Sequence, residues 1–166
     1  MPAALLTLEA LAAALPAKAR LIGVDLGTKT IGLALSDVER RIATPLVTLA
    51  RSQFSRDAQA LGEQVRKFEA FALVLGLPLN MDGGEGQRVQ ATRAFARNFA
   101  RVDPTPIVFW DERLSTAAVT RAMIGADVSR ARRAEVVDKM AAAYILQGAL
   151  DRLANIAAAE AATKQP

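Results

Sequence analysis

The sequence predicts an α/β domain in which a mixed five-stranded sheet is flanked by helices. Two strand-like runs joined by a tight turn come first, and strands and helices then alternate along the chain. A hairpin followed by such alternation is typical of a sheet that combines antiparallel and parallel strands. The chain has 166 residues, of which 52% are apolar. This is enough for one domain with a substantial core.

The first 19 residues are expected to form a helical extension. Apolar side chains recur there at the spacing of one helical face, at Leu5, Leu8, Ala12 and Leu15. Pro16 follows them, and Glu9 interrupts the apolar run that a secretory signal peptide would need. No apolar run in the chain approaches the roughly 18 residues of a membrane span. We therefore expect a cytoplasmic protein that has no membrane partner.

The hairpin that follows joins a strand at 21–26 to a strand at 31–36. The connection at 27–30 is short enough for antiparallel pairing. Asp25 lies at the end of the first apolar run, where an ionised carboxylate is costly unless a cation meets it. Asp25 is therefore either a ligand of a cation or a cap of the following turn. The residues alone leave both interpretations open.

The rest of the chain is expected to alternate strands and helices. In order, we predict a strand at 45–49, a helix at 57–69, a strand in FALVLGLPL, a loop in NMDGGEGQ, a helix at 87–101, a strand that begins PIVFWDERLST, and a long helix at 132–155. No repeat or linker interrupts this pattern. Residues 20–155 are therefore expected to form one domain, followed by an Ala-rich tail at 156–166.

Composition restricts the chemistry that is available to this chain. It has no histidine and no cysteine, so an imidazole base and a thiolate nucleophile are excluded. Carboxylates remain as metal ligands, and hard oxygen ligands favour Mg²⁺ or Mn²⁺. The net charge is +4 and most of the cations are arginine, whose planar fork suits phosphate. Nucleic acid is thus a candidate partner, although ordinary solvated arginines explain the same charge.

Four stretches in the same order resemble the YqgF (RuvX) family: RLIGVDLGTKTIGLALSD, GLPLNMDGGEG, DERLST and DKMAAAYILQ. Members of this family are described as Holliday junction resolvases and as pre-16S ribosomal RNA processing nucleases. The resemblance extends from about Arg20 to Leu153. It implies an RNase H-like fold and a carboxylate site that binds divalent metal, with Asp25 as the first ligand.

The DERLST stretch offers two neighbouring acids, Asp111 and Glu112. Ideal strand alternation turns them to opposite faces, so only one easily reaches a site shared with Asp25. The resemblance implies that Glu112 is the ligand and leaves Asp111 to orient the loop by hydrogen bonds. Asp82 and Glu85 stay open as replacements, although loop acids are often simply solvated.

Asp138 is the third ligand that the resemblance implies. Helical spacing places it on one face with Ala142, Ile145 and Ala149, and we expect that face to pack on the sheet. The alternative is a first-turn aspartate that complements the helix dipole, which would be preferred if the helix began near Val136.

The resemblance therefore implies a metal-dependent endonuclease that acts on pre-rRNA or branched DNA. Asp25, Glu112 and Asp138 would hold Mg²⁺ or Mn²⁺, which activates a water and stabilises the leaving oxygen. Substrate contacts are expected from Thr28, Lys29, Arg113 and Ser115. A homodimer stays open, because an enzyme that cuts a junction symmetrically would benefit from one.

Two other classes of function stay open. DLGTKTIGLALSD also looks like the phosphate hairpin of actin-like ATPases, but those enzymes need a second related domain, and the chain has no second such hairpin. The other class is a non-catalytic nucleic-acid-binding factor in ribosome assembly. The acids count against it, because a surface that only binds phosphate gains nothing from buried negative charge.

Overall fold

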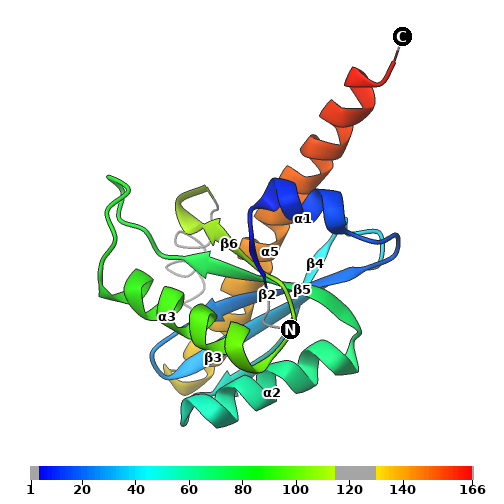
Figure 1. Cartoon of the computed structure of the whole chain (residues 1–166). Coiled ribbons are helices and arrows are strands. Elements are labelled where there is room, and N and C mark those ends of the chain that lie inside the picture. The colour runs from blue at the N-terminus through cyan, green and yellow to red at the C-terminus, as the bar shows by residue number, and fades with distance from the viewer. Residues whose placement is uncertain (1–3, 115–129, 166) are drawn as a thin grey trace.

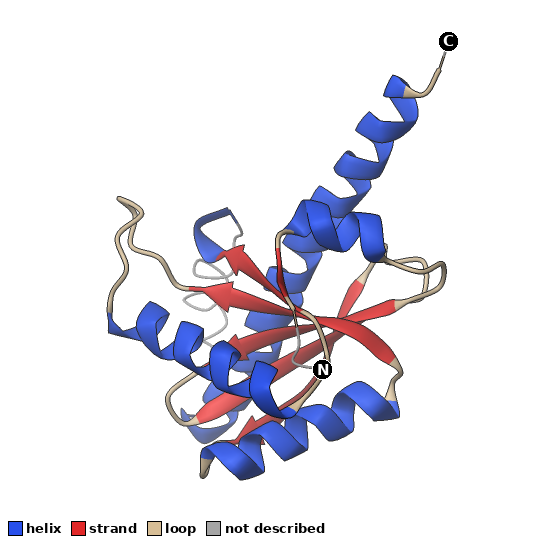
Figure 2. Cartoon of the chain, viewed as in Figure 1, coloured by secondary structure: helices blue, strands red, loops and turns tan. Residues whose placement is uncertain are grey.

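The computed structural model describes the backbone of residues 4–114 and 130–165, and the side chains of residues 4–114 and 139–165. Within these residues a six-stranded sheet lies between two layers of helices (Figures 1 and 2). The elements are β1 (Leu5–Leu6), α1 (Leu8–Ala14), β2 (Arg20–Leu26), β3 (Thr30–Ser36), β4 (Ala43–Ala50), α2 (Phe54–Lys67), β5 (Ala70–Leu77), α3 (Gln87–Val102), β6 (Ile107–Asp111), the 3₁₀ helix η1 (Glu112–Leu114) and α5 (Arg130–Thr163).

The sheet is mixed, as the sequence predicts. Its strand order is β1-β6-β5-β2-β3-β4. The pairs β2–β3 and β3–β4 are antiparallel, whereas β2–β5, β5–β6 and β1–β6 are parallel. The predicted hairpin is confirmed, and its turn is closed by a 2.9 Å hydrogen bond from the Gly27 N–H to the Thr30 carbonyl.

The prediction of five strands was one short, because Leu5 and Leu6 form an edge strand instead of the start of a helix. They pair with Ile107 and Val108 of β6. Two residues are too short to show the alternation that identifies a strand in a sequence. The N-terminal helix itself is confirmed as α1, where the Thr7 hydroxyl accepts a 3.1 Å hydrogen bond from the Ala10 N–H and caps the helix.

The N-terminal and C-terminal segments contact each other. In α1, Leu11 is fully buried in the hydrophobic cluster that includes residues of α5. The Ala-rich tail, predicted apart from the last helix, continues α5 to Thr163. Alanine is the strongest helix former, so an Ala-rich segment extends a helix readily. None of the described helices is long and apolar enough to cross a membrane.

Two hydrophobic clusters, one on each side of the sheet, hold the layers together. Side chains that alternate along the strands, such as Leu21, Val74 and Trp110, pack against α1 and α5. Their neighbours, such as Ile22 and Leu75, pack with residues of α2 and α3. We call the first side the α5 face of the sheet. Because both sides are covered, β2 and β5 are almost continuously apolar.

Candidate metal site

The carboxyl ends of β2, β5 and β6 lie at the same edge of the sheet, since the three strands are parallel neighbours (Figure 1). Asp25 is the next-to-last residue of β2, and Gly76 is the next-to-last residue of β5. Glu112 directly follows β6, as the first residue of η1. Strand ends of this kind are where α/β sheets place their functional groups.

Asp25 is a buried carboxylate, with only 3% of its surface exposed. It lies within the β2–β3 ladder, opposite Gly32, and not in the turn that follows. Two residues earlier, Gly23 contacts α5, since a Cβ there would lie 2.6 Å from the Leu146 Cβ. Residues two apart on a strand share a face, so Asp25 lies on the α5 face of the sheet.

Glu112 reaches the same face from β6. A Cβ added at Gly76 would lie 3.1 Å from the Glu112 carboxyl carbon and 2.5 Å from Cδ1 of Ile145 in α5. The β2–β5 register pairs Val24 with Leu75, so the next residues along, Asp25 and Gly76, are neighbours. Ile145 and the Glu112 carboxyl group therefore pack directly over Gly76 on the α5 face, with Asp25 on the strand beside it.

Asp138 lies in α5, one helical turn before Ala142. The carbonyl oxygen of Ala142 lies 2.7 Å from where a Cβ at Gly23 would be, so the backbone of α5 passes close to β2 at this point. The helix begins at Arg130 and has no acid in its first turn. Asp138 is about two turns into the helix, where the dipole effect that the alternative interpretation needs has faded.

The side chains of Asp138 and Ser115 lie outside the described ones, so their predicted roles stay predictions. Among the side chains that the structure describes, no group of three or more acids could hold a metal ion. The described part of the site thus offers two carboxylates, Asp25 and Glu112. With no histidine or cysteine in the chain, the site offers hard oxygen donors, and these fit Mg²⁺ or Mn²⁺.

Asp111 has the loop-orienting contacts that its place in DERLST predicts. It accepts a 3.0 Å hydrogen bond from the Arg113 backbone N–H and a 2.7 Å bond from the Arg113 guanidinium. The same guanidinium donates to the Met81 carbonyl at 3.3 Å and so connects η1 to the Gly-rich loop. In this structure Arg113 thus links Asp111 to the Gly-rich loop. Its contact with phosphate stays a prediction.

The Asp111–Arg113 pair should make stability depend on pH. The guanidinium hydrogen bond is the main cause that lowers the pKa of Asp111 below its ordinary value. The pair therefore stabilises the fold above the pKa that Asp111 has in the unfolded chain, and this contribution is lost as pH falls through the lowered pKa. We expect Asp111→Asn to cost about 0.2–1 kcal/mol at pH 7. Urea unfolding should show the two proteins converging at acid pH, and a constant gap would contradict the pairing.

The two loop acids have local partners. Asp82 accepts a 2.8 Å hydrogen bond from the Gly84 N–H, inside a turn where Gly83 has a φ of 87°. Glu85 forms an ion pair with Arg93 of α3. Both contacts shape the Gly-rich loop, which makes a structural role the simpler interpretation of these acids.

Arg51 supports the hairpin turn, a role that sequence patterns did not reveal. Its guanidinium donates to the Gly27 carbonyl at 2.8 Å, and its backbone N–H donates to the Lys29 carbonyl at 2.9 Å. The buried carboxylate of Asp57 lies 3.5 Å from the Arg51 Nε. Arg51 thereby fixes the turn in which Thr28 and Lys29 are exposed, directly after the strand that carries Asp25.

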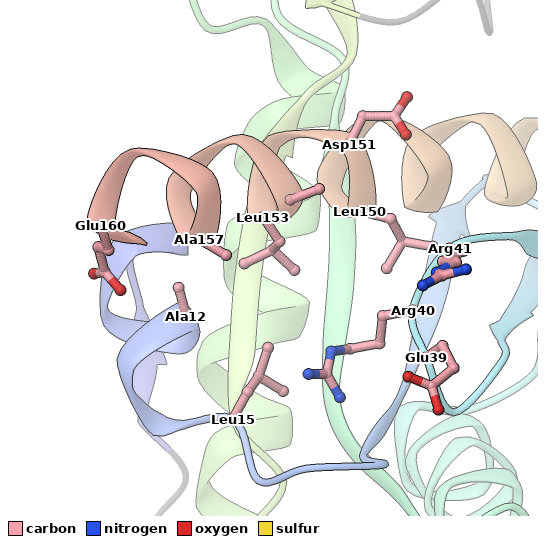
Figure 3. A pocket seen from close by; sticks show the side chains of 11 residues that line it. Ala12, Leu15, Glu39, Arg40, Arg41, Leu150, Asp151, Leu153, Ala157 and Glu160 are labelled. Carbon is pink, nitrogen blue, oxygen red and sulfur yellow. The ribbon is translucent and has the colours of Figure 1, made fainter. Parts of the chain in front are cut away.

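A cavity of about 440 Å³ lies between α1, α5 and the β3–β4 turn (Figure 3). Leu15, Leu150 and Leu153 line it together with Arg40. The Arg40 guanidinium donates to the Ala19 carbonyl at 2.7 Å and so holds the segment that leads into β2. This cavity is at the amino end of β2, away from Asp25.

The mixed sheet between two layers of helices defines an α/β fold, and Asp25 and Glu112 lie at the ends of its strands. Among solved structures, Thermus thermophilus RuvC in complex with a Holliday junction substrate aligns with a TM-score of 0.51 at 13% identity, covering 81% of this chain and 96% of that one. At this identity the likeness shows the fold, and it confirms the predicted RNase H-like class.

The sequence comparisons identify the family. The profile of RuvX, described as Holliday junction resolvase, matches residues 19–152. A Methylocella silvestris protein named "Putative pre-16S rRNA nuclease" is 65% identical over 158 residues, which are 95% of this chain and 98% of that protein. A Rhodopseudomonas palustris (strain HaA2) protein of the same name is 60% identical over 156 residues, which are 94% and 98% of the two chains. The chain belongs to the RuvX family.

Proposed function

We propose that this protein is a divalent-metal-dependent endonuclease that hydrolyses phosphodiester bonds in structured nucleic acid, either pre-16S rRNA or branched DNA. The observation that carries the proposal is the buried Asp25 carboxylate at the strand end, on the same face of the sheet as Glu112. Membership of the RuvX family and the names of the relatives support nuclease activity.

Asp25, Glu112 and Asp138 are the residues that would hold Mg²⁺ or Mn²⁺. Such an ion supplies Lewis-acid activation of water and stabilises the charge that develops on the leaving oxygen. The protein contributes position: Asp25 is fixed inside the sheet, and the hairpin turn is held by Arg51. The chain has no imidazole, so it cannot use a histidine as the base.

Substrate contacts in this proposal come from the surface around the strand ends. Thr28 and Lys29 are exposed at the hairpin turn, and Arg113 and Ser115 would contact phosphate beyond β6. Contacts to the backbone carry little sequence information, so selectivity should come from the shape of the substrate. A cytoplasmic location and a homodimer on a symmetric junction belong to the same proposal.

The first experiment incubates purified protein and Mg²⁺ or Mn²⁺ with a four-way DNA junction and, separately, with a precursor 16S rRNA fragment. We expect one of them to be cut, leaving 5′-phosphate and 3′-hydroxyl ends. Failure to cut either substrate with either metal would contradict the proposal. Thermal stabilisation by ATP without any cleavage would favour the actin-like alternative instead.

Asp138→Asn tests the third ligand through metal binding as well as through cleavage. A metal present at 100 times its Kd stabilises the native state by about 2.7 kcal/mol, which raises the melting temperature of a chain of this size by roughly 5–10 °C. We expect the variant to lose most of this rise and all cleavage, and to be as stable as the parent without metal. A variant that keeps the metal-induced rise and the activity would make Asp138 a structural residue.

A further inference from the structure

Helix α3 carries an unusual charge distribution for a surface helix. Its residues Gln87–Val102 include four arginines, Arg88, Arg93, Arg97 and Arg101, and no acid. The neighbouring helix α2 on the same side of the sheet has acids, Asp57 and Glu63, among its basic residues. Helix α3 therefore carries four positive charges that no acid on the same helix offsets.

Three of these arginines form one stripe. Arg93, Arg97 and Arg101 are spaced four residues apart, so they follow one side of the helix over about 12 Å. The other side of α3 is buried by apolar residues such as Phe95 and Phe99. Arg97 and Arg101 are exposed, and neither makes an ion pair with another described residue. We call Arg93, Arg97 and Arg101 the α3 stripe.

The stripe begins beside the Gly-rich loop, although α3 itself packs on the side of the sheet opposite to the α5 face that carries Asp25. Arg93 pairs with Glu85 of the Gly-rich loop, and its guanidinium lies 5.2 Å from the ring centroid of Phe109 in β6. The Gly-rich loop follows the carboxyl end of β5, at the same edge of the sheet as Asp25 (Figure 1). Arg97 and Arg101 then lead away from that edge along the helix.

Like charges four residues apart repel each other on a helix. The C-terminal end of the helix dipole favours a cation at Arg101, but this effect does not extend to Arg97. No acid on the helix compensates the repulsion between them. A row of arginines without compensating acids is complementary in charge to a polyanion. A nucleic acid would neutralise such a row through its phosphates.

We propose that the α3 stripe is a track for the phosphate backbone of the nucleic-acid substrate, on which Arg97 and Arg101 contact a segment that lies beyond the cleavage point. This inference rests on the proposed function, because it takes the candidate metal site as the place of cleavage. The ligand chemistry is a phosphodiester backbone, and the two substrates in the test distinguish RNA from DNA as its source.

The test compares the double variant Arg97→Gln/Arg101→Gln with a matched control, Arg152→Gln/Lys164→Gln. Arg152 is exposed on α5, where it pairs with Glu9 of α1, and Lys164 is exposed directly after the end of α5 at Thr163. The C-terminal part of α5 extends away from the sheet (Figure 2), and both variants lose the same charge. Binding of a labelled four-way junction and of a precursor 16S rRNA fragment is measured by fluorescence anisotropy from 50 to 200 mM salt, with metal chelated to prevent cleavage.

We expect the slope of log affinity against log salt to fall in magnitude by about 1 for each phosphate contact removed, so by about 2 in the stripe variant. The control should keep the slope of the parent. In cleavage assays the stripe variant should show a raised KM with kcat nearly unchanged, since its residues do not touch the reacting phosphate.

An unchanged slope in the stripe variant would overturn the track, as would an equal loss of slope in the control, because bulk charge alone would then explain binding. A parent protein that binds with the expected slopes but cuts neither substrate would contradict the nuclease proposal. The α3 stripe could then not be assigned to a cleavage substrate. If the parent protein cuts but the stripe variant binds as tightly as the parent, the nuclease proposal is supported and the role of the α3 stripe is rejected.

Discussion

Replacing Asp25 with Asn should reduce cleavage by more than about 100-fold, because loss of a group that only orients a metal ligand already costs 10–100-fold. The amide keeps the shape of the side chain but removes its charge. Initial rates at saturating Mg²⁺ or Mn²⁺, on whichever substrate the parent cuts, give the measurement. The metal-induced rise in melting temperature should disappear together with the activity.

The same variant should be as stable as the parent, or more so, when metal is absent. If the carboxylates of Asp25, Glu112 and Asp138 face one another, as the proposed metal site requires, their like charges repel without metal and the fold gives up stability to hold them. Asp37→Asn is the matched control: Asp37 is exposed in a turn, and its carboxylate accepts hydrogen bonds from the backbone N–H groups of Arg41 and Ile42. The control should keep full cleavage and the full metal response. An Asp25→Asn protein that still cuts at more than a tenth of the parental rate would limit Asp25 to a structural role.

Asp37 itself shows what local sequence can predict. Its place in the polar SDVERR stretch predicts a turn residue, and the two backbone hydrogen bonds confirm this. They also lower the pKa of the Asp37 carboxyl group, with the Ile42 N–H as the largest cause. Contacts of this kind lie within a few residues of the carboxylate, so the sequence contains all the information needed to infer them.

Long apolar runs allowed most of the fold to be predicted. β2, β3 and β5 are buried on both sides, and a run that is apolar throughout identifies a buried strand without knowledge of its neighbours. Placement of the acids at strand ends followed from the same runs. The beginning of α5 was predicted at 132 and lies two residues earlier, at Arg130. That beginning matters for the site, since it puts Asp138 beyond the first turn.

Contacts between distant parts of the chain could not be predicted. Arg51 supports a turn that lies more than twenty residues before it, and no periodicity connects the two. Gly23 and Gly76 are also inconspicuous in their apolar runs, and their roles depend on where α5 crosses the sheet. A sequence pattern indicates whether a segment is buried or exposed. The contacts between two segments can be determined only from the coordinates of both.

Replacing Gly23 with Ala should give the largest loss of stability among the substitutions considered. The added Cβ would lie 2.6 Å from the Leu146 Cβ and 2.7 Å from the Ala142 carbonyl oxygen. Neither atom can rotate away, because both are fixed by the backbone of α5, so the helix must move off β2. Overpacking costs about 1–3 kcal/mol, while alanine in a strand recovers only about 0.5–1 kcal/mol of the penalty that glycine carries.

The net effect of Gly23→Ala should therefore be a loss of about 1–2 kcal/mol in the free energy of unfolding, or roughly 2–8 °C in melting temperature for a chain of this size.

Gly76→Ala is the informative comparison, since the atoms that a Cβ would meet there include Cδ1 of Ile145 and the carboxyl carbon of Glu112. Those groups lie toward the ends of side chains and can shift, so Gly76→Ala should lose less stability. It should nonetheless weaken the metal response, because the new methyl group would displace the Glu112 carboxyl group, a proposed metal ligand. Thermal melts with and without Mn²⁺ measure both effects, and a Gly23→Ala protein as stable as the parent would show that α5 does not rest on β2 at this position.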